Sequence, residues 1–348
     1  MSTEIVIRAD ASNTIGAGHV MRCLSLAGEL RSQGSVITFV CQESAGDCCD
    51  LIEEKGFRVF RLSGCADWQD DSRQTLEALQ THAVRPDCLV VDHYGLESRW
   101  ERNLRGAVRS VAVIDDLADR PHECELLLDQ NYYDDLDRRY DGLVPRGARR
   151  LLGPHFALLR PEFVRAPSDT GPPAVDRLFV SVGAHDPFGL CEKAVAAVRL
   201  VGHDSLGAEI VAGADAQLRE RLRDAVSDLS GVRVHGFVHE MSSLMARCSM
   251  AFGAGGSSTW ERCALGIPAL VTVVADNQRR MSQDLARAGI IVLLGEAREL
   301  TVTELAAAIA RCLSDRSLLE SLRLKSRALV DGGGSRRVAE EVLGIAHA

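Results

Sequence analysis

With 348 residues, the chain is longer than the roughly 250 to 300 residues at which a single hydrophobic core stops growing, so two domains are expected. The 46% hydrophobic and 26% charged residues are typical of a globular protein, and no apolar run approaches the ~20 residues needed to cross a bilayer. The formal net charge of -9, without a basic stripe, argues against a nucleic-acid partner.

The N-terminus and the cysteines indicate a reducing compartment. The sequence MSTEIVIRAD carries Glu4 in place of a basic stretch and runs directly into a strand pattern, so we predict no signal peptide and a cytoplasmic protein. The 11 cysteines are odd in number, include the adjacent pair Cys48 and Cys49, and show no CxxC spacing. Reduced thiols are therefore predicted, and neither zinc nor a disulfide framework is indicated.

Short β-rich runs alternate with helical periodicity through the first half, which predicts a parallel sheet with helices on both faces. The predicted strands are 4–9, 35–40, 58–62, 88–92 and 110–115. The predicted helices lie near 19–33, 70–83 and 97–107.

A passage rich in Pro, Gly and charge, 132–175, interrupts this alternation and marks a domain boundary. We expect domains at 1–150 and 176–348, with 151–175 as the connection. The predicted strands of the second domain are 177–182, 208–212, 232–237, 249–253, 268–273 and 290–294, and 301–346 is helical with a break at 332–334. Two Rossmann-like, doubly wound domains facing each other would enclose a ligand at the carboxyl ends of their strands.

The first candidate motif, Gly16-Ala17-Gly18-His19-Val20-Met21-Arg22, follows a strand and opens a helix. Gly16 and Gly18 allow a tight turn, and the helix N-terminus favours an anion and a neutral imidazole at His19, which can act as a base. The motif lacks the third glycine of GxGxxG, so it is not a dinucleotide fingerprint. A plain strand-to-helix turn remains the alternative.

The second motif, residues 254–261, again reads as strand, glycine turn and helix. The amides of Gly255 and Gly256, with the hydroxyls of Ser257 and Ser258, suit a diphosphate, and Glu261 is placed to accept hydrogen bonds from a ribose. The alternative is that these residues only cap the N-terminus of a helix, with a serine as the N-cap and Glu261 in a capping box.

Polar groups also follow other predicted strands. Asn277 and Gln278 could bind sugar hydroxyls or acetamido groups, or Asp276 and Asn277 could merely cap a helix. Asp92, His93 and Tyr94 close another strand. The neighbours Asp115 and Asp116 occupy a similar place and are better explained as a turn or cap than as metal ligands.

Taken together, RADASNTIGAGHVMRC, VVDHYGL, VIDDLADR, LLLDQN, LLGPHFALLRPEF and GAGGSSTWERCALGIPALVTVVADNQ resemble the UDP-sugar hydrolases of pseudaminic acid biosynthesis. These enzymes remove UDP from a 2,4-diacetamido-2,4,6-trideoxy-altrose. The family is related to the N-acetylglucosamine transferase of peptidoglycan synthesis and shares its GT-B fold. The resemblance runs through most of residues 4–290.

The resemblance implies hydrolysis at the anomeric carbon with inversion, without metal or cofactor, on a small-molecule UDP-sugar. It makes His19 the base that activates water, with Tyr94 and Asn277 holding the sugar, and Phe237 and Val238 contacting uracil through their backbone. The residues expected to bind substrate are Asp10, Gly16, Gly18, Arg22, Asp92, Gly183, Phe237, Val238, Gly255, Gly256, Ser257, Ser258, Glu261 and Gln278.

Two positions depart from the family pattern. A glycine pair with a hydroxyl residue usually stands where this chain has Gly183-Ala184-His185, and a smaller residue usually stands at His93. Both departures bear on which sugar is accepted.

Two rival functions stay open. A transferase of the same fold would pass the sugar to an acceptor, but its membrane-associated relatives carry a basic, apolar patch on the N-terminal domain, and no such run occurs here. A non-catalytic protein would bind the nucleotide sugar without turnover and would not need a neutral histidine at a helix start.

Overall fold

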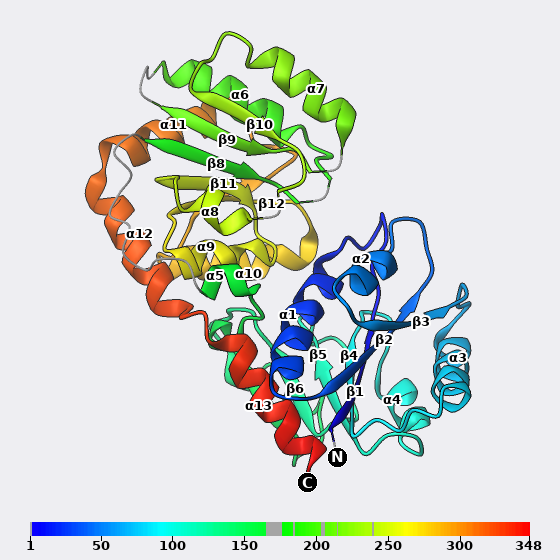
Figure 1. Cartoon of the computed structure of the whole chain (residues 1–348). Coiled ribbons are helices and arrows are strands. Elements are labelled where there is room, and N and C mark those ends of the chain that lie inside the picture. Colours follow the sequence, from blue (N-terminus) through cyan, green and yellow to red (C-terminus); the bar gives the residue numbers. More distant parts are fainter. Residues whose placement is uncertain (1, 165–175, 184, 203–205, 214, 239) are drawn as a thin grey trace. The chain divides into compact units, whose positions relative to one another are not determined.

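The computed structural model describes residues 2–164, 176–183, 185–202, 206–213, 215–238 and 240–348 (Figure 1). The chain forms two compact units. Unit 1 comprises Met1–Asn131, Asp135–Arg160 and Gly333–Ala348, and unit 2 comprises Tyr132–Asp134 and Pro161–Gly332. No helix in the described part of the chain is both long and apolar enough to span a membrane.

Within the described residues, unit 1 is built on a seven-stranded parallel sheet in the order β3-β2-β1-β4-β5-β6-β7. The strands are β1 (Glu4–Ala9), β2 (Val36–Gln42), β3 (Arg58–Leu62), β4 (Cys88–Asp92), β5 (Ser110–Ile114), β6 (Leu126–Asp129) and β7 (Arg149–Leu152). The helices are α1 (Gly18–Ser32), α2 (Cys49–Glu54), α3 (Trp68–Thr81), α4 (Ser98–Leu104) and α13 (Gly334–Ala346), with 3-10 turns at Leu136–Arg138 and Pro154–Phe156.

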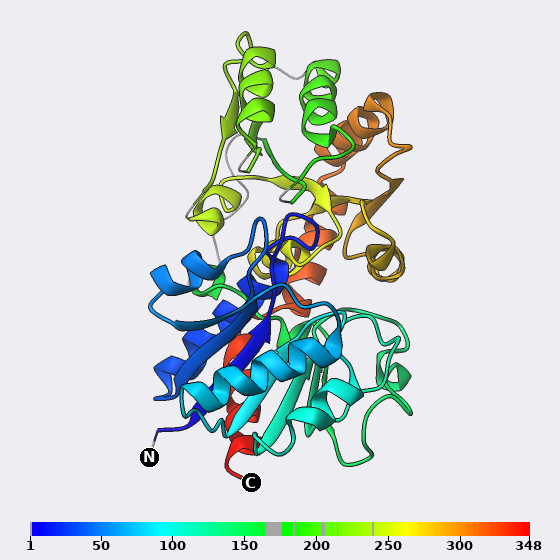
Figure 2. The ribbon, with the colours of Figure 1, turned by 90° about the vertical axis from the view of Figure 1, so that its right-hand side faces the viewer.

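The sheet of unit 1 is buried on both faces because its strands are apolar almost throughout. Ile5 and Ile7 of β1 point into a core shared with α1, α2 and α13, while Val6 points into a second core shared with α3 and α4. This period of two is the expected geometry of a strand. Figure 2 shows the red helix α13 and the cyan helix α3 on opposite sides of the sheet.

Unit 2 repeats this plan with a six-stranded parallel sheet among the described residues, in the order β10-β9-β8-β11-β12-β13. The strands are β8 (Arg177–Ser181), β9 (Gly207–Val211), β10 (Val232–His235), β11 (Met250–Ala254), β12 (Ala269–Val273) and β13 (Val292–Glu296). The helices are α5 (Pro161–Val164), α6 (Leu190–Val201), α7 (Ala216–Ala225), α8 (Met241–Met245), α9 (Ser258–Leu265), α10 (Asp276–Arg287), α11 (Val302–Ser314) and α12 (Arg316–Leu329).

Local sequence sets several of these helix ends. Thr301 and Glu304 form a capping box at the start of α11, in which each satisfies a backbone N–H of the other. Helix α9 ends at Gly266, which adopts the left-handed conformation that glycine reaches without steric cost.

The structure divides the chain differently from the expected boundaries. Residues 151–160, expected in the connection, belong to unit 1, because β7 pairs with β6 and the turn at Pro154–Phe156 packs beside α13. The last helix also belongs to unit 1, although it was expected in the second domain. Part of the expected connection, 165–175, lies outside the described residues.

Candidate functional site

In each parallel sheet, two central strands are neighbours from which the chain adds further strands toward opposite edges; we call this point the strand-order reversal. The candidate residues lie at these two points. In unit 1, β1 and β4 are neighbours, and the chain winds outward from them to both edges. In unit 2, β8 and β11 have the same relation. Open parallel sheets bind ligands outside the carboxyl ends of such strands, because the loops diverge there and leave a crevice. The motif of His19 follows β1, Asp92 ends β4, and the glycine loop follows β11.

In unit 1, His19 is oriented by a buried carboxylate. Its Nδ1 lies 2.6 Å from Oδ1 of Asp92, a side chain with no solvent exposure. Burial alone would raise the pKa of Asp92, but Arg22 and His19 hold that pKa well below its usual range. The carboxylate is thus ionised and accepts a hydrogen bond from the N–H at Nδ1, which leaves Nε2 as the nitrogen with a lone pair. No partner of Nε2 is found among the described residues.

Arg22, one turn after His19 on α1, fixes the carboxylate. Its Nε and Nη2 donate to the two oxygens of Asp92, each at 2.6 Å, in a bidentate arrangement. Its Nη1 donates to Oδ2 of Asp116 at 2.9 Å. Arg22 and Asp92 were expected to bind substrate, but the fully buried Asp92 has no free surface for a ligand. Both oxygens of Asp92 accept hydrogen bonds from His19 and Arg22, so Asp92 orients His19.

Tyr94 lies beside His19 and Asp116. Its ring meets the ring of His19 edge-on, with centroids 4.5 Å apart. Burial and the negative charge of Asp116, to which the hydroxyl is hydrogen-bonded, raise the pKa of Tyr94. The phenol therefore stays protonated and donates its one proton to Asp116, which leaves the lone pairs of the hydroxyl oxygen to accept a hydrogen bond from a ligand.

His93, the other histidine at this strand end, is engaged through both nitrogens. The backbone N–H of Gly95 donates to Nδ1 at 3.0 Å, and Nε2 lies 3.3 Å from Oδ2 of Asp10. Nε2 must then carry the proton, so His93 has no lone pair to offer a substrate. Of these two histidines, His19 is the one with a ring nitrogen that has no partner among the described residues.

Asp10 was also expected to bind substrate, and the structure places it in a buried ion-pair network. Arg8 donates to it, and Oδ1 accepts the backbone N–H of Gln42 at 2.7 Å. Only 5% of Asp10 is exposed. The side chain therefore holds the end of β1 and the loop of His93, and direct contact with substrate is not supported.

The glycines of the first motif form the turn that was predicted. Gly16 has φ +80°, a conformation that favours glycine, and its N–H bonds to the Ser12 carbonyl at 2.8 Å. Gly18 begins α1, whose N-cap Ala17 makes no side-chain cap. The first amides of α1 are therefore available to an anion.

In unit 2, the loop after β11 brings Gly255 and Gly256 to the start of α9. Ser257 is the N-cap of α9 and makes no side-chain cap hydrogen bond, so the capping box considered as the alternative is not formed. Ser257 is exposed, whereas Ser258 and Glu261 are half-buried.

A second loop lies beside this one. Gln278 of α10 accepts the backbone N–H of Val274, and its Nε2 would lie 3.7 Å from a Cβ added at Gly256. Asn277 is exposed in the first turn of α10. The N-cap of α10 is Ala275, without a side-chain cap, so neither Asp276 nor Asn277 caps the helix as the alternative had it.

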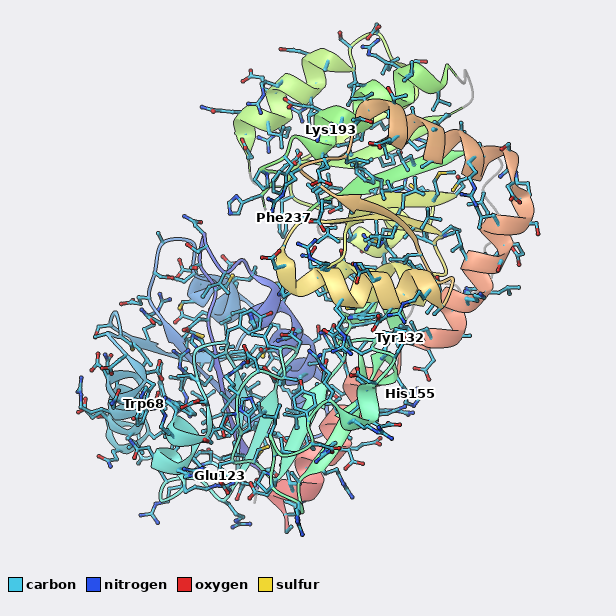
Figure 3. The ribbon with its side chains drawn as sticks, turned by 180° about the vertical axis from the view of Figure 1, so that it is seen from behind. Trp68, Glu123, Tyr132, His155, Lys193 and Phe237 are labelled. Carbon is cyan, nitrogen blue, oxygen red and sulfur yellow. The ribbon has the colours of Figure 1, made fainter. Side chains whose placement is uncertain are left out.

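The remaining predicted residues follow β8 and β10. Gly183 has φ +108° and is exposed, while its neighbour Ala184 lies outside the described residues. Phe237, labelled in Figure 3, is 72% exposed in the loop after β10, and Val238 is half-buried.

Sequence reasoning missed Asp116, which was explained as part of a turn or cap. It follows β5, the neighbour of β4, and therefore reaches Arg22 and Tyr94. Its place at a strand's carboxyl end was a usable signal, but the order of the strands was needed to weigh it.

Comparison with known proteins gives distant relatives, and no family model matches. The sequence is 24% identical over 291 residues to an uncharacterized protein of Methanocaldococcus jannaschii and 29% identical over 185 residues to the UDP-2,4-diacetamido-2,4,6-trideoxy-beta-L-altropyranose hydrolase of Campylobacter jejuni. These matches cover 81% and 53% of this chain, but only 58% and 61% of the respective relatives. The spore coat polysaccharide biosynthesis protein SpsG of Bacillus subtilis is 23% identical, with 96% of both chains covered.

Solved structures match over the whole chain. MurG of Acinetobacter baumannii superimposes with a TM-score of 0.71 at 13% identity, covering 98% of this chain and 99% of that one. UGT2 of Phytolacca americana, solved with UDP-2-fluoro-glucose and pterostilbene, gives a TM-score of 0.71 at 12% identity and covers both chains fully. The chain therefore has the GT-B fold.

Proposed function

We propose that this chain is a UDP-sugar hydrolase that releases UDP by attack of water at the anomeric carbon with inversion. One observation carries the proposal: His19 is held by Asp92 at the strand-order reversal of unit 1, with Nε2 left without a partner among the described residues. A buried carboxylate that fixes the tautomer of a histidine is the arrangement of a general base.

The proposed reaction begins with water beside Nε2 of His19. The water oxygen forms a bond to the anomeric carbon while the bond from that carbon to the phosphate oxygen breaks, and UDP departs with the electron pair. Nε2 takes the proton from the water. Asp92 then stabilises the imidazolium, since its carboxylate accepts a hydrogen bond from the other ring N–H, with Nδ1 and Oδ1 2.6 Å apart.

In this proposal the departing UDP is bound by unit 2. The amides of Gly255, Gly256, Ser257 and Ser258 stabilise the charge that grows on the diphosphate, as aimed N–H groups can do without a bound cation. Glu261 holds the ribose, and the backbone at Phe237 and Val238 contacts uracil. The sugar is held by Tyr94, whose phenol is protonated, and by Asn277 and Gln278.

The sugar we propose is 2,4-diacetamido-2,4,6-trideoxy-β-L-altrose, in cytoplasmic biosynthesis of pseudaminic acid. Support comes from the motifs named above and from the name of the Campylobacter jejuni relative. A second candidate, transfer of the sugar to an acceptor, is favoured by the transferases among the relatives, such as the N-acetylglucosamine transferase of Listeria monocytogenes, 25% identical over 134 residues.

The test is UDP release from UDP-activated diacetamido sugars without an acceptor, with a metal chelator present, and with the anomeric proton followed by NMR. Release with inversion supports the hydrolase. Release only after an acceptor is added supports the transferase, and UDP-sugar binding without release under either condition overturns both.

The matched variants are His19→Ala and His155→Ala. His19→Ala is expected to bind UDP normally and to lose at least about a hundredfold in turnover, the usual effect of removing a general base. His155, an exposed histidine of unit 1, should be dispensable. Near-normal turnover of His19→Ala would exclude His19 as the base.

A further inference from the structure

Beneath the glycine loop of unit 2 lies the guanidinium of Arg262, with which no carboxylate of the described residues forms an ion pair. Arg262 of α9 is 1% exposed, and no ion pair of its side chain is found among the described residues. Buried charges in proteins are normally paired, because desolvation of an isolated ion is costly. Burial lowers the pKa of Arg262 to about 10, so the side chain is still a cation at neutral pH.

The hydrogen bonds of Arg262 span the loop. Its Nη2 donates to the carbonyl of Ala254, the last residue of β11, at 2.8 Å, and to Oγ1 of Thr259, in the first turn of α9, at 2.9 Å. These two acceptors flank Gly255, Gly256, Ser257 and Ser258. The guanidinium thus joins the two ends of the loop, and its Nε has no partner in the described part of the chain.

The charge also lies close to the strand-order reversal of unit 2. A Cβ added at Gly253 of β11 would lie 3.0 Å from Nη1 of Arg262 and 2.1 Å from the carbonyl oxygen of Ser181, at the end of β8. Glycine at position 253 therefore allows the guanidinium and both central strands to approach one another. Arg262 sits between the strand ends where a parallel sheet binds its ligand.

We propose that Arg262 is a positioning residue of the diphosphate loop, and that the ligand's diphosphate supplies the negative charge with which no described residue pairs Arg262. The inference rests on the proposed function, since it takes the loop after β11 as the diphosphate site. Arg262 acts from behind the loop: it fixes the backbone whose amides bind the phosphates, and its charge attracts them through a medium of low dielectric constant. A ligand without phosphates gains nothing from this charge.

The experiment compares the affinities of UDP and uridine for wild type, Arg262→Gln and Arg262→Lys by calorimetry. Wild type should bind UDP more tightly than uridine. Arg262→Gln should lose at least about tenfold of that preference, with little change for uridine, whereas Arg262→Lys retains the charge and most of the preference at pH 6. Arg247→Gln, a change at an exposed arginine of unit 2, is the control and should alter neither affinity.

Arg262→Lys also provides a test that does not depend on the folding of the glutamine variant. A fully buried lysine loses its proton far more readily than an arginine, and Glu261 and Cys263 are the ionisable groups that act on this position. The terminal phosphate of UDP itself titrates at about pH 6, so each variant is compared with wild type at the same pH. The UDP preference of Arg262→Lys should fall relative to that of wild type between pH 6 and pH 9.

The outcomes separate the two proposals. A UDP preference that survives intact in folded Arg262→Gln, or that in Arg262→Lys keeps a constant ratio to the wild-type preference from pH 6 to pH 9, overturns the role of Arg262 alone. A wild-type protein that shows no preference for UDP over uridine overturns the diphosphate site, and with it the proposed function.

Discussion

Asp92 decides which nitrogen of His19 is offered to a ligand. The carboxylate accepts from Nδ1, and its own geometry is fixed by two hydrogen bonds from Arg22. An asparagine at position 92 would keep the volume but remove the charge, and its amide could donate to Nδ1 and so select the other tautomer. This would turn the lone pair of His19 away from the proposed water.

Asp92→Asn is therefore expected to lower turnover by about a hundredfold or more, with little change in UDP affinity. The measurement is UDP release under saturating substrate, together with UDP binding by calorimetry. Asp87→Asn is the control, because Asp87 precedes the same strand at its other end, where it accepts the backbone N–H of Glu4 and lies 3.6 Å from Nη2 of the exposed Arg109. An equal loss of turnover in Asp92→Asn and Asp87→Asn would show that Asp92 contributes only to stability.

The same carboxylate makes stability depend on pH. Its pKa is held below the usual range in the folded chain by Arg22 and His19, against the opposing effect of burial. A carboxylate with a lowered folded-state pKa stabilises the fold above the unfolded pKa of about 4, and this contribution is lost as the pH falls through the folded pKa.

The free energy of unfolding of wild type should therefore be about 2 kcal/mol higher than that of Asp92→Asn at pH 6 to 8. This difference in unfolding free energy should become smaller below about pH 4. Urea denaturation at several pH values measures it. A gap that widens toward acid would contradict the ionised state of Asp92.

At the scale of elements, the glycine loop of unit 2 depends on packing as well as on ligand chemistry. A Cβ at Gly255 would lie 2.4 Å from Oγ of Ser282 on α10, while a Cβ at Gly256 meets only Nε2 of Gln278 at 3.7 Å. Contacts under 3 Å cannot be kept, so a side chain at position 255 forces the loop and α10 apart. From the sequence alone, both glycines were expected to bind the phosphates.

Gly255→Ala should therefore destabilise unit 2 by about 1–3 kcal/mol and weaken UDP binding, whereas Gly256→Ala should do neither. The double change Gly255→Ala with Ser282→Ala removes the clash and should recover both properties, because the next neighbours of the new Cβ lie at 3.5 and 3.6 Å. Thermal unfolding and UDP calorimetry test it. Failure of the second change to rescue would show that the amide approach at Gly255, not Ser282, requires glycine.

Hydrophobic periodicity predicted some strands better than others. Strands with long apolar runs, such as β4 and β5, were predicted to within a residue. β6 and β7 were not, since β6 spans only four residues and β7 begins with two arginines and buries only Leu151. Short or edge strands carry too few buried positions to produce the pattern.

For the whole molecule, the sequence indicated two α/β domains of GT-B type, and the two sheets confirm that fold. It could not show that His19 meets Asp92, 73 positions later, because strand order is a tertiary property that local periodicity does not encode. The same limit applies to α13. Its apolar face was visible in the spacing of Val338, Val342 and Ala346, but nothing in that spacing indicates which sheet it covers.

Helix α13 belongs to unit 1, where Val342 is fully buried against the core that also contains β1 and β4. Val342→Asp would place an unpaired charge in that core and should cost about 3 kcal/mol or more. Hydrogen exchange followed by mass spectrometry should then show faster exchange in β1 and β4, while β8 and β11 of unit 2 stay protected. Gly344→Asp is the matched control, since position 344 is exposed and a Cβ there meets only Arg149 at 3.9 Å. Loss of protection confined to β8 and β11 would mean that the last helix stabilises unit 2, and the division of the chain given above would be wrong.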